Sequence, residues 1–131
     1  MMKRRFFIGI SIFSMGIVIA LGIGTISNIL TPFKNFLLTV DNQSNDEISS
    51  IEIGLIHMDS KELFTDPIKK GETKKFKPTL SLSGEGSIYL KYTDAKGQST
   101  QETVCGYTEY LSGYSTVTIT NEGTTVVQQC N

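Results

Sequence analysis

The stretch GSIYLKYTDAKGQSTQETVC, residues 86–105, carries a clear strand-turn-strand pattern. Ile88, Leu90 and Tyr92 recur at every second position, which is the period of a strand with one buried face. Residues 94–97 then supply a four-residue turn that ends in glycine, the residue that best tolerates positive φ. The polar residues that follow return as a second strand, so the stretch predicts an antiparallel β-hairpin.

Outward from this hairpin, the same alternation predicts further strands at residues 36–40, 51–55, 73–83, 115–120 and 124–130. Pro78 has no backbone N–H, which places the strand at 73–83 at a sheet edge. The Asp, Asn and Ser residues at 41–46 predict a turn, and only residues 59–66 are expected to be helical. Short strands separated by frequent turns predict an all-β fold, an antiparallel immunoglobulin-like sandwich.

The chain before this sandwich has a different composition, because none of the 28 residues between Arg5 and Lys34 is charged. A helix of about 20 apolar residues is long enough to cross a bilayer. We therefore predict a single N-terminal transmembrane helix. The expected organisation is a cytoplasmic stub at 1–5, a transmembrane signal-anchor helix at 6–30, a linker at 31–35 and an exported β-sandwich domain at 36–131.

The charges that flank this helix predict its orientation. Lys3, Arg4 and Arg5 precede the helix and Lys34 alone follows it, and the more basic flank stays in the cytoplasm. We expect a single-pass protein of the cell membrane, with a cytoplasmic N-terminus and a periplasmic or extracellular C-terminal domain. Small residues near the end of the helix leave cleavage by signal peptidase open. The apolar run exceeds the roughly 7–15 residues of a secretory signal, which favours an uncleaved anchor.

One stripe of the predicted helix consists of small residues, namely Gly9, Gly16, Ala20 and Gly24. Such a stripe lets a second helix approach closely, which predicts a homodimer through the transmembrane helix. Glycine is also frequent in membrane helices that do not pair, so both interpretations stay open.

The composition of the exported part excludes several classes of function. From Lys34 onward, nine lysines stand against 13 acidic residues, a net charge of −4, so no nucleic-acid partner is expected. His57 is the only histidine and continues the inward alternation after Leu55, which indicates a structural role. Without a second histidine or a free thiol, the chain is expected to hold no metal or cofactor and to be no enzyme.

Two charged stretches each allow two interpretations. Residues 41–47 carry side chains that ligate calcium, but they lack the spacing of a known calcium loop and have the composition of an ordinary turn. The lysines between residues 69 and 77 either meet anionic lipid headgroups or protect a sheet edge from strand pairing. In both stretches the structural interpretation is preferred.

The two cysteines, Cys105 and Cys130, lie on the exported, oxidising side of the membrane, so we expect a disulfide between them. Pairing of Thr93 with Gln98 in the first hairpin places the Cys105 sulfur on the core side.

The last hairpin decides on which face the second cysteine lies. A two-residue turn at 122–123 pairs Ser115 with Cys130 and points the sulfur inward, whereas a three-residue turn at 121–123 pairs Tyr114 with Cys130 and points it outward. The two-residue turn is preferred because it agrees with the inward position of the first cysteine.

Three tyrosines, Tyr107, Tyr110 and Tyr114, lie between the cysteines together with glycine and serine. Tyrosine offers a large contact area with few rotatable bonds, and this composition is typical of recognition loops. We therefore predict a binding surface at these tyrosines. The alternative is that one or two of the rings cap the end of the sandwich.

Several turn motifs resemble those of small exported bacterial immunoglobulin-like β-sandwich proteins of unassigned function, over residues 36–126. They are the turn at 42–44, Gly71-Glu72, Gly86-Ser87-Ile88 with Tyr92, Asp94 and Gly97, and the pairs Gly106-Tyr107 and Gly113-Tyr114. The resemblance implies a fold and an exported location, and it implies no catalytic residues.

Three functions follow as hypotheses. The first is a non-enzymatic, membrane-tethered module that binds an unidentified protein or envelope component through its tyrosines, with the lipid bilayer as its other partner. The second is an immunity protein that neutralises a toxin in the periplasm or at the cell envelope. The third is a structural subunit of the envelope held by its transmembrane stripe.

Overall fold

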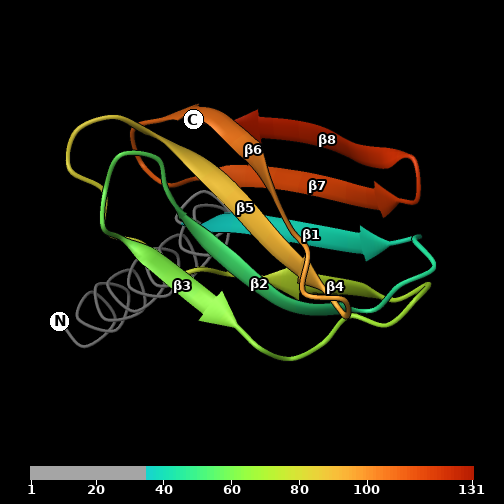
Figure 1. Cartoon of the computed structure of the whole chain (residues 1–131). Coiled ribbons are helices and arrows are strands. Elements are labelled where there is room, and N and C mark those ends of the chain that lie inside the picture. Colours follow the sequence, from blue (N-terminus) through green and yellow to red (C-terminus); the bar gives the residue numbers. More distant parts are fainter. Residues whose placement is uncertain (1–34) are drawn as a thin grey trace, which may run out of the picture. The chain divides into compact units, whose positions relative to one another are not determined.

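The computed structural model describes residues 35–131, which fold into eight strands (Figure 1). The strands are β1 (Phe36–Asn42), β2 (Ile48–Leu55), β3 (Lys61–Phe64), β4 (Thr73–Phe76), β5 (Gly86–Asp94), β6 (Ser99–Thr108), β7 (Gly113–Thr120) and β8 (Gly123–Cys130). No helix within residues 35–131 is long and apolar enough to cross a membrane. The transmembrane helix predicted at 6–30, including its stripe of small residues, lies outside the described residues.

The strands form two four-stranded sheets, with the orders β4-β1-β7-β8 and β3-β2-β5-β6. This confirms the predicted all-β sandwich. Every pairing is antiparallel except that of β1 with β7, which run parallel with Phe36 opposite Gly113 and Asn42 opposite Ile119. The expectation of a purely antiparallel fold was wrong for this pair, because side chains alternate in the same way in both kinds of pairing.

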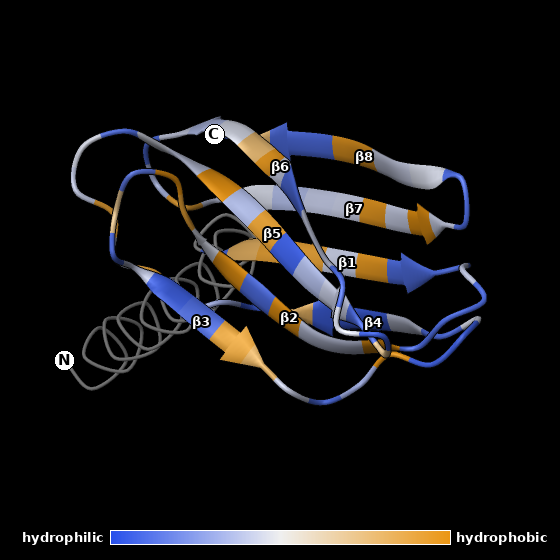
Figure 2. Ribbon diagram, in the orientation of Figure 1, coloured by the Kyte–Doolittle hydropathy of each residue, from blue (hydrophilic) through white to orange (hydrophobic). Residues whose placement is uncertain are grey.

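The core lies between the sheets and consists of alternating apolar residues. Figure 2 shows hydrophobic and hydrophilic residues alternating along strands such as β2 and β5. The fully buried members of the core include Leu38, Val40, Ile51, Ile53, Ile88, Leu90 and Val117. Burial of one such side chain contributes about 1.5–3 kcal/mol to folding. The inward faces of β1, β2, β5 and β7 therefore carry most of the stabilising burial.

The sandwich is closed differently along its two sides. On one side, the rings of Phe64 in β3 and Phe76 in β4 lie 5.0 Å apart. On the other side, a disulfide joins Cys105 in β6 to Cys130 in β8. The position of β4 at a sheet edge confirms the prediction, although the strand ends before Pro78, where the chain leaves the sheet and crosses to β5.

The helix predicted at residues 59–66 was wrong, because Lys61–Phe64 is strand β3. Leu63 lies opposite Glu52 in β2, and Phe64 lies opposite Ile51. A helix of one turn forms one hydrogen bond for several fixed dihedral angles and is unstable alone. Pairing with β2 satisfies the backbone of this segment and brings Phe64 onto the core, so tertiary contacts outweigh local propensity.

The β5–β6 hairpin differs by one residue from its predicted register. Thr93 lies opposite Ser99 and not Gln98. If this shift of one residue continued along the hairpin, the side chain of Cys105 would point outward. A β-bulge farther along the pair restores the inward position, and Val104 and Cys105 are both fully buried as a result. The predicted side of the first cysteine is thus confirmed, through a different register.

The β7–β8 hairpin has a two-residue turn at 121–122, one residue earlier than predicted. Cys130 therefore lies opposite Gly113 and not Ser115. Asn121 is held in this turn because its Oδ1 accepts a hydrogen bond from the backbone N–H of Asn45, at 2.8 Å. A shift of two residues in the pairing leaves every side chain on its predicted face, so Cys130 still points inward.

Candidate functional site

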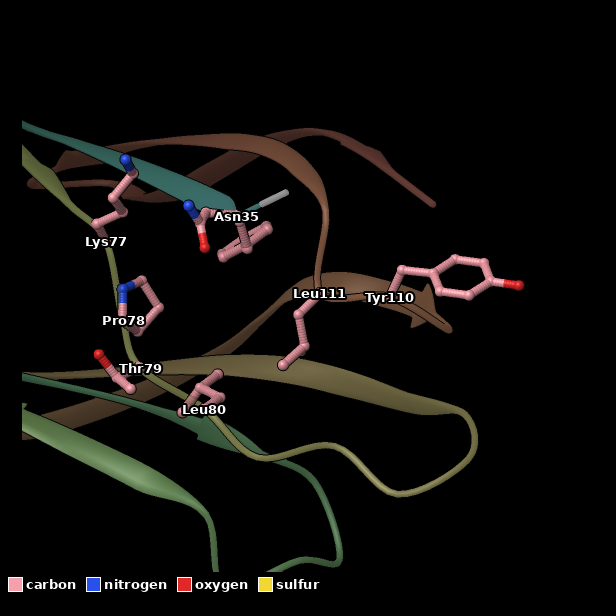
Figure 3. Close-up of a pocket in the computed structure, with 8 residues that line it drawn as sticks. Asn35, Lys77, Pro78, Thr79, Leu80, Tyr110 and Leu111 are labelled. Atoms are coloured by element: carbon pink, nitrogen blue, oxygen red, sulfur yellow. The ribbon is translucent and has the colours of Figure 1, made fainter. Parts of the chain in front are cut away.

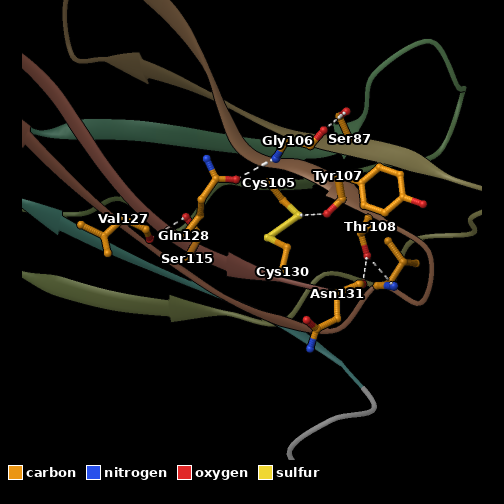
Figure 4. The surroundings of a disulfide bond; sticks show 11 residues. Ser87, Cys105, Gly106, Tyr107, Thr108, Ser115, Val127, Gln128, Cys130 and Asn131 are labelled. Carbon is orange, nitrogen blue, oxygen red and sulfur yellow. Dashed lines mark hydrogen bonds between the residues drawn. A yellow bond between two sulfur atoms is a disulfide. The ribbon is translucent and has the colours of Figure 1, made fainter.

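The candidate site is built on the disulfide between Cys105 and Cys130, whose Cα atoms lie 6.0 Å apart (Figure 4). This bond confirms the predicted pairing. It links the edge strands of the two sheets, β6 and β8, near the end of the sandwich at which β1 and β7 begin. The 24 residues between the cysteines therefore form a closed loop that contains all three candidate tyrosines.

Hydrogen bonds hold the chain on both sides of the disulfide (Figure 4). The backbone N–H of Gly106 donates to Gln128 Oε1 at 2.7 Å, and Ser87 Oγ donates to the Gly106 carbonyl at 2.7 Å. Thr108 Oγ1 donates to the Asn131 carbonyl at 2.6 Å and accepts from the N–H of Leu111 at 3.0 Å. The segment that carries the tyrosines is thus fixed at its base.

All three predicted tyrosines are exposed, which is unusual for side chains of their size. The exposed fractions are 51% for Tyr107 at the end of β6, 74% for Tyr110 in the β6–β7 loop and 49% for Tyr114 at the start of β7. We call these three residues the tyrosine surface. They do not stack on one another, since the close aromatic pair found within residues 35–131 is Phe64 with Phe76. Each ring presents its own contact area at the same end of the sandwich.

The hydroxyl groups of the tyrosine surface have different surroundings. Tyr107 donates to Glu109 and, at 3.2 Å, to Glu85. The hydrogen bond to Glu109 is the main cause that raises the pKa of Tyr107 to about 12, so its phenol stays neutral at physiological pH. Tyr114 donates to Gln129 Oε1 at 2.8 Å, whereas Tyr110 extends into solvent. The neutral phenol of Tyr107 is suited to contact and hydrogen bonding.

A small pocket of about 260 Å³ lies beside Tyr110 (Figure 3). It is lined by Asn35, Phe36, Lys77, Pro78, Thr79, Leu80, Tyr110 and Leu111. Figure 3 shows Leu111 directed toward Leu80 while the ring of Tyr110 points away from the pocket. Leu111 has a φ of 50°, in the left-handed region that residues other than glycine rarely adopt.

Glycine is required where the loop enters β7. Gly113 has a φ of 102°, and a Cβ atom at this position would lie 2.1 Å from the Gln129 carbonyl oxygen. No other residue fits such an approach without moving β8. The position of the tyrosine loop relative to the disulfide thus depends on this glycine.

A larger groove of about 640 Å³ lies at the opposite end of the sandwich, between the turns that follow β1, β5 and β7. Its charged lining residues are Asp46, Asp94, Lys96, Glu102 and Glu122, and we call it the acidic groove. Tyr92 lies at its base and shares a hydrogen bond with Thr124 at 2.8 Å. No local sequence pattern predicts this groove, because its lining residues come from turns and strands that are far apart in the chain.

Among the remaining sequence candidates, Lys77 lines the pocket beside Tyr110. His57 is exposed in the turn after β2 with a φ of 65°, so its predicted inward position was wrong. Lys69 and Lys70 lie at the same end as the acidic groove, where Lys70 Nζ donates to Asn45 at 2.8 Å. Within residues 35–131, no three His, Cys, Asp or Glu side chains are grouped so as to hold a metal ion.

No protein-family model and no curated protein sequence matches this chain. Among solved structures, an NMR structure of a protein from Eubacterium rectale is similar, with a TM-score of 0.49 and 9% sequence identity. The similarity covers 75% of this chain and 91% of the other. The functional conclusion therefore depends on the chain's own residues.

Proposed function

We propose that this chain is a non-enzymatic, membrane-tethered binding module, and that the tyrosine surface contacts a protein or another component of the cell envelope. The observation that carries the proposal is that three tyrosines, each about half exposed or more, lie on one disulfide-closed segment. Large, rigid aromatic side chains supply much of the binding energy in protein contacts. A fixed loop loses little conformational entropy when it binds.

The proposed location belongs to the same hypothesis. A signal-anchor helix at residues 6–30 would hold the sandwich outside the cytoplasm, and the disulfide between Cys105 and Cys130 supports an oxidising compartment. We also propose that the sandwich is immunoglobulin-like in the loose sense, since domains of this kind share two packed sheets without always sharing one topology.

A specific observation favours a second candidate function. The acidic groove carries four carboxylates and one lysine, and a basic partner would be attracted to such a surface. An immunity protein that blocks a basic toxin would use the groove in this way. The third hypothesis, a structural envelope subunit, depends on the helix stripe outside the described residues.

Photo-crosslinking in intact cells tests the proposal. A benzophenone amino acid replaces Tyr110 in one full-length variant and Ala95, an exposed residue of the β5–β6 turn, in a matched control. We expect a cross-linked adduct at position 110, with a lower yield when Tyr107→Ala and Tyr114→Ala are added. An adduct at position 95 alone would instead support the acidic groove and the second function. The absence of any adduct at position 110 would contradict the proposal.

A further inference from the structure

We infer that the tyrosine surface contacts the headgroup layer of the same membrane that anchors the chain. This inference deepens the proposed function and rests on its tether, since it names the envelope component as the outer leaflet of the bilayer. Two observations and one prediction carry it. The observations are the place where the described chain begins and the chemistry of the end of the sandwich that carries the tyrosines, and the prediction is the short linker at residues 31–35.

The chain enters the sandwich at the same end as the tyrosine surface. Asn35 and Phe36, at the start of β1, line one pocket together with Tyr110 and Leu111 (Figure 3). The parallel pairing of β1 with β7 explains this arrangement, because it places Phe36 opposite Gly113, two residues after Leu111. A purely antiparallel sheet would have carried the tyrosine loop to the opposite end.

The linker limits how far this end can lie from the membrane. Only residues 31–35 separate the predicted helix at 6–30 from β1, and five extended residues span at most about 17 Å. The seven residues of β1 then carry the chain about 23 Å farther, toward the acidic groove. An anchor at residues 6–30 would therefore be joined to the sandwich at the end that carries the tyrosine surface, and the acidic groove lies at the opposite end.

This distance disfavours a folded protein as the occupant of the tyrosine surface. A domain of 100 residues has a radius of gyration of about 13 Å, so its diameter exceeds the linker length. The headgroup layer is already within reach and needs no additional partner.

The chemistry of this end fits the interfacial region of a bilayer. Tyrosines are enriched there because the ring is apolar and the hydroxyl forms hydrogen bonds with headgroups and water. Charge contributes little among the described residues, since Lys77 lines the pocket beside Tyr110 while Glu85 and Glu109 accompany Tyr107. The contact is thus aromatic, and a zwitterionic phosphatidylcholine surface suffices.

The absence of tryptophan from the chain gives a direct test. The full-length Tyr110→Trp variant is reconstituted in phosphatidylcholine vesicles, with and without a lipid that carries a nitroxide on its headgroup. The matched control is Ala95→Trp, at the end that carries the acidic groove. We expect the indole at position 110 to emit at shorter wavelength and to lose emission when the nitroxide lipid is present. The indole at position 95 should respond only to a water-soluble quencher.

Each outcome decides between occupants. An indole at position 110 that the water-soluble quencher reaches as readily as the one at position 95 overturns the inference. An indole that neither quencher reaches means that a second copy of the chain covers the surface, which also overturns it. In both cases, retention of the protein in the vesicles after an alkaline wash leaves the tether intact. Loss of the protein from the vesicles would overturn the tether and the inference together.

Discussion

Among single residues, Asn42 organises the turn at residues 41–47, whose side chains could also have suggested a calcium site. Its buried Nδ2 donates to the carbonyls of Asp46, at 2.9 Å, and Ile68, at 3.0 Å. Its Oδ1 accepts from the N–H and the hydroxyl of Ser44, at 3.1 and 2.7 Å. Since all these contacts are internal, the residue closes the end of the sandwich and leaves no side-chain atom free for an ion.

This network makes Asn42→Asp strongly destabilising. The variant places a carboxylate against two carbonyl oxygens and loses both donors, which costs about 2–4 kcal/mol in the free energy of unfolding. Urea denaturation at pH 7 measures the difference. Asn45→Asp is the matched control, because its exposed Oδ1 only accepts a hydrogen bond from Lys70. Equal free energies of unfolding for the two variants would contradict the stabilising role of the Asn42 hydrogen bonds.

A second residue-scale feature is the contact of Tyr89 with Glu52. The Tyr89 hydroxyl donates to Glu52 Oε1 at 2.7 Å and Lys61 Nζ lies 3.3 Å from Oε2. The hydrogen bond from Tyr89 is the main cause that lowers the pKa of Glu52, and Lys61 adds to it. Burial is the main cause that raises the pKa of Tyr89 to about 12, followed by the bond to Glu52.

These shifts predict the pH dependence of stability. A lowered pKa of Glu52 stabilises the fold at neutral pH, and this contribution is lost as acid protonates the folded carboxylate. The raised pKa of Tyr89 stabilises the fold below pH 10, and this contribution is lost between pH 10 and about 12. The Tyr89→Phe variant should therefore unfold at a lower urea concentration than the wild type at pH 7. The difference between their urea midpoints should become smaller at both acidic and strongly alkaline pH. A difference in urea midpoint that stays constant from pH 2 to pH 12 would contradict a stabilising hydrogen bond between Tyr89 and Glu52.

At the scale of elements, the disulfide between β6 and β8 is the main covalent constraint on the sandwich. It closes a loop with a sequence separation of 25 residues, and the chain-entropy relation gives about 3.5 kcal/mol for such a loop. Cys105→Ala with Cys130→Ala should lower the free energy of unfolding by roughly this amount. Urea denaturation of the wild type with and without a reductant provides an independent measurement. If reduction leaves the free energy of unfolding unchanged, the disulfide does not stabilise the fold by closing this loop, which would contradict the prediction.

Side-chain alternation predicted β1, β2, β5, β7 and β8, because each of these strands buries one face against the opposite sheet. The four-residue strand β3 could not be predicted in this way, since at its edge position Leu63 is 61% exposed. Side-chain alternation with a period of two also does not predict the parallel pairing of β1 with β7 or the bulge before Cys105. The three tyrosines could be identified from the sequence. Their position at the same end of the sandwich as Asn35 could not, because it follows from the strand order, which no local pattern encodes.

At the scale of the whole molecule, orientation in the membrane should control the disulfide. The triple variant Lys3→Gln, Arg4→Gln, Arg5→Gln removes the basic flank and leaves Lys34 as the more basic side of the predicted helix. A fraction of the chains should then keep the sandwich in the reducing cytoplasm. Alkylation of free thiols followed by gel electrophoresis measures this fraction.

The control for this experiment removes the same charge elsewhere. Lys69→Gln, Lys70→Gln and Lys75→Gln alter exposed lysines of the sandwich and should leave both cysteines oxidised. Free thiols in the control variant, or none in the variant at residues 3–5, would contradict the predicted orientation.

The parallel pairing of β1 with β7 also determines how the domain bears mechanical load. Tension applied at the start of β1, as the proposed anchor would apply it, acts along a strand that lies between β4 and β7 and is matched to β7 over seven residue pairs. A pull on the far end of the sandwich opposes this tension along the strand axis, so the cross-strand hydrogen bonds are sheared as a group and are not unzipped one by one. Strand β1 thereby resists extraction through hydrogen bonds that share the load.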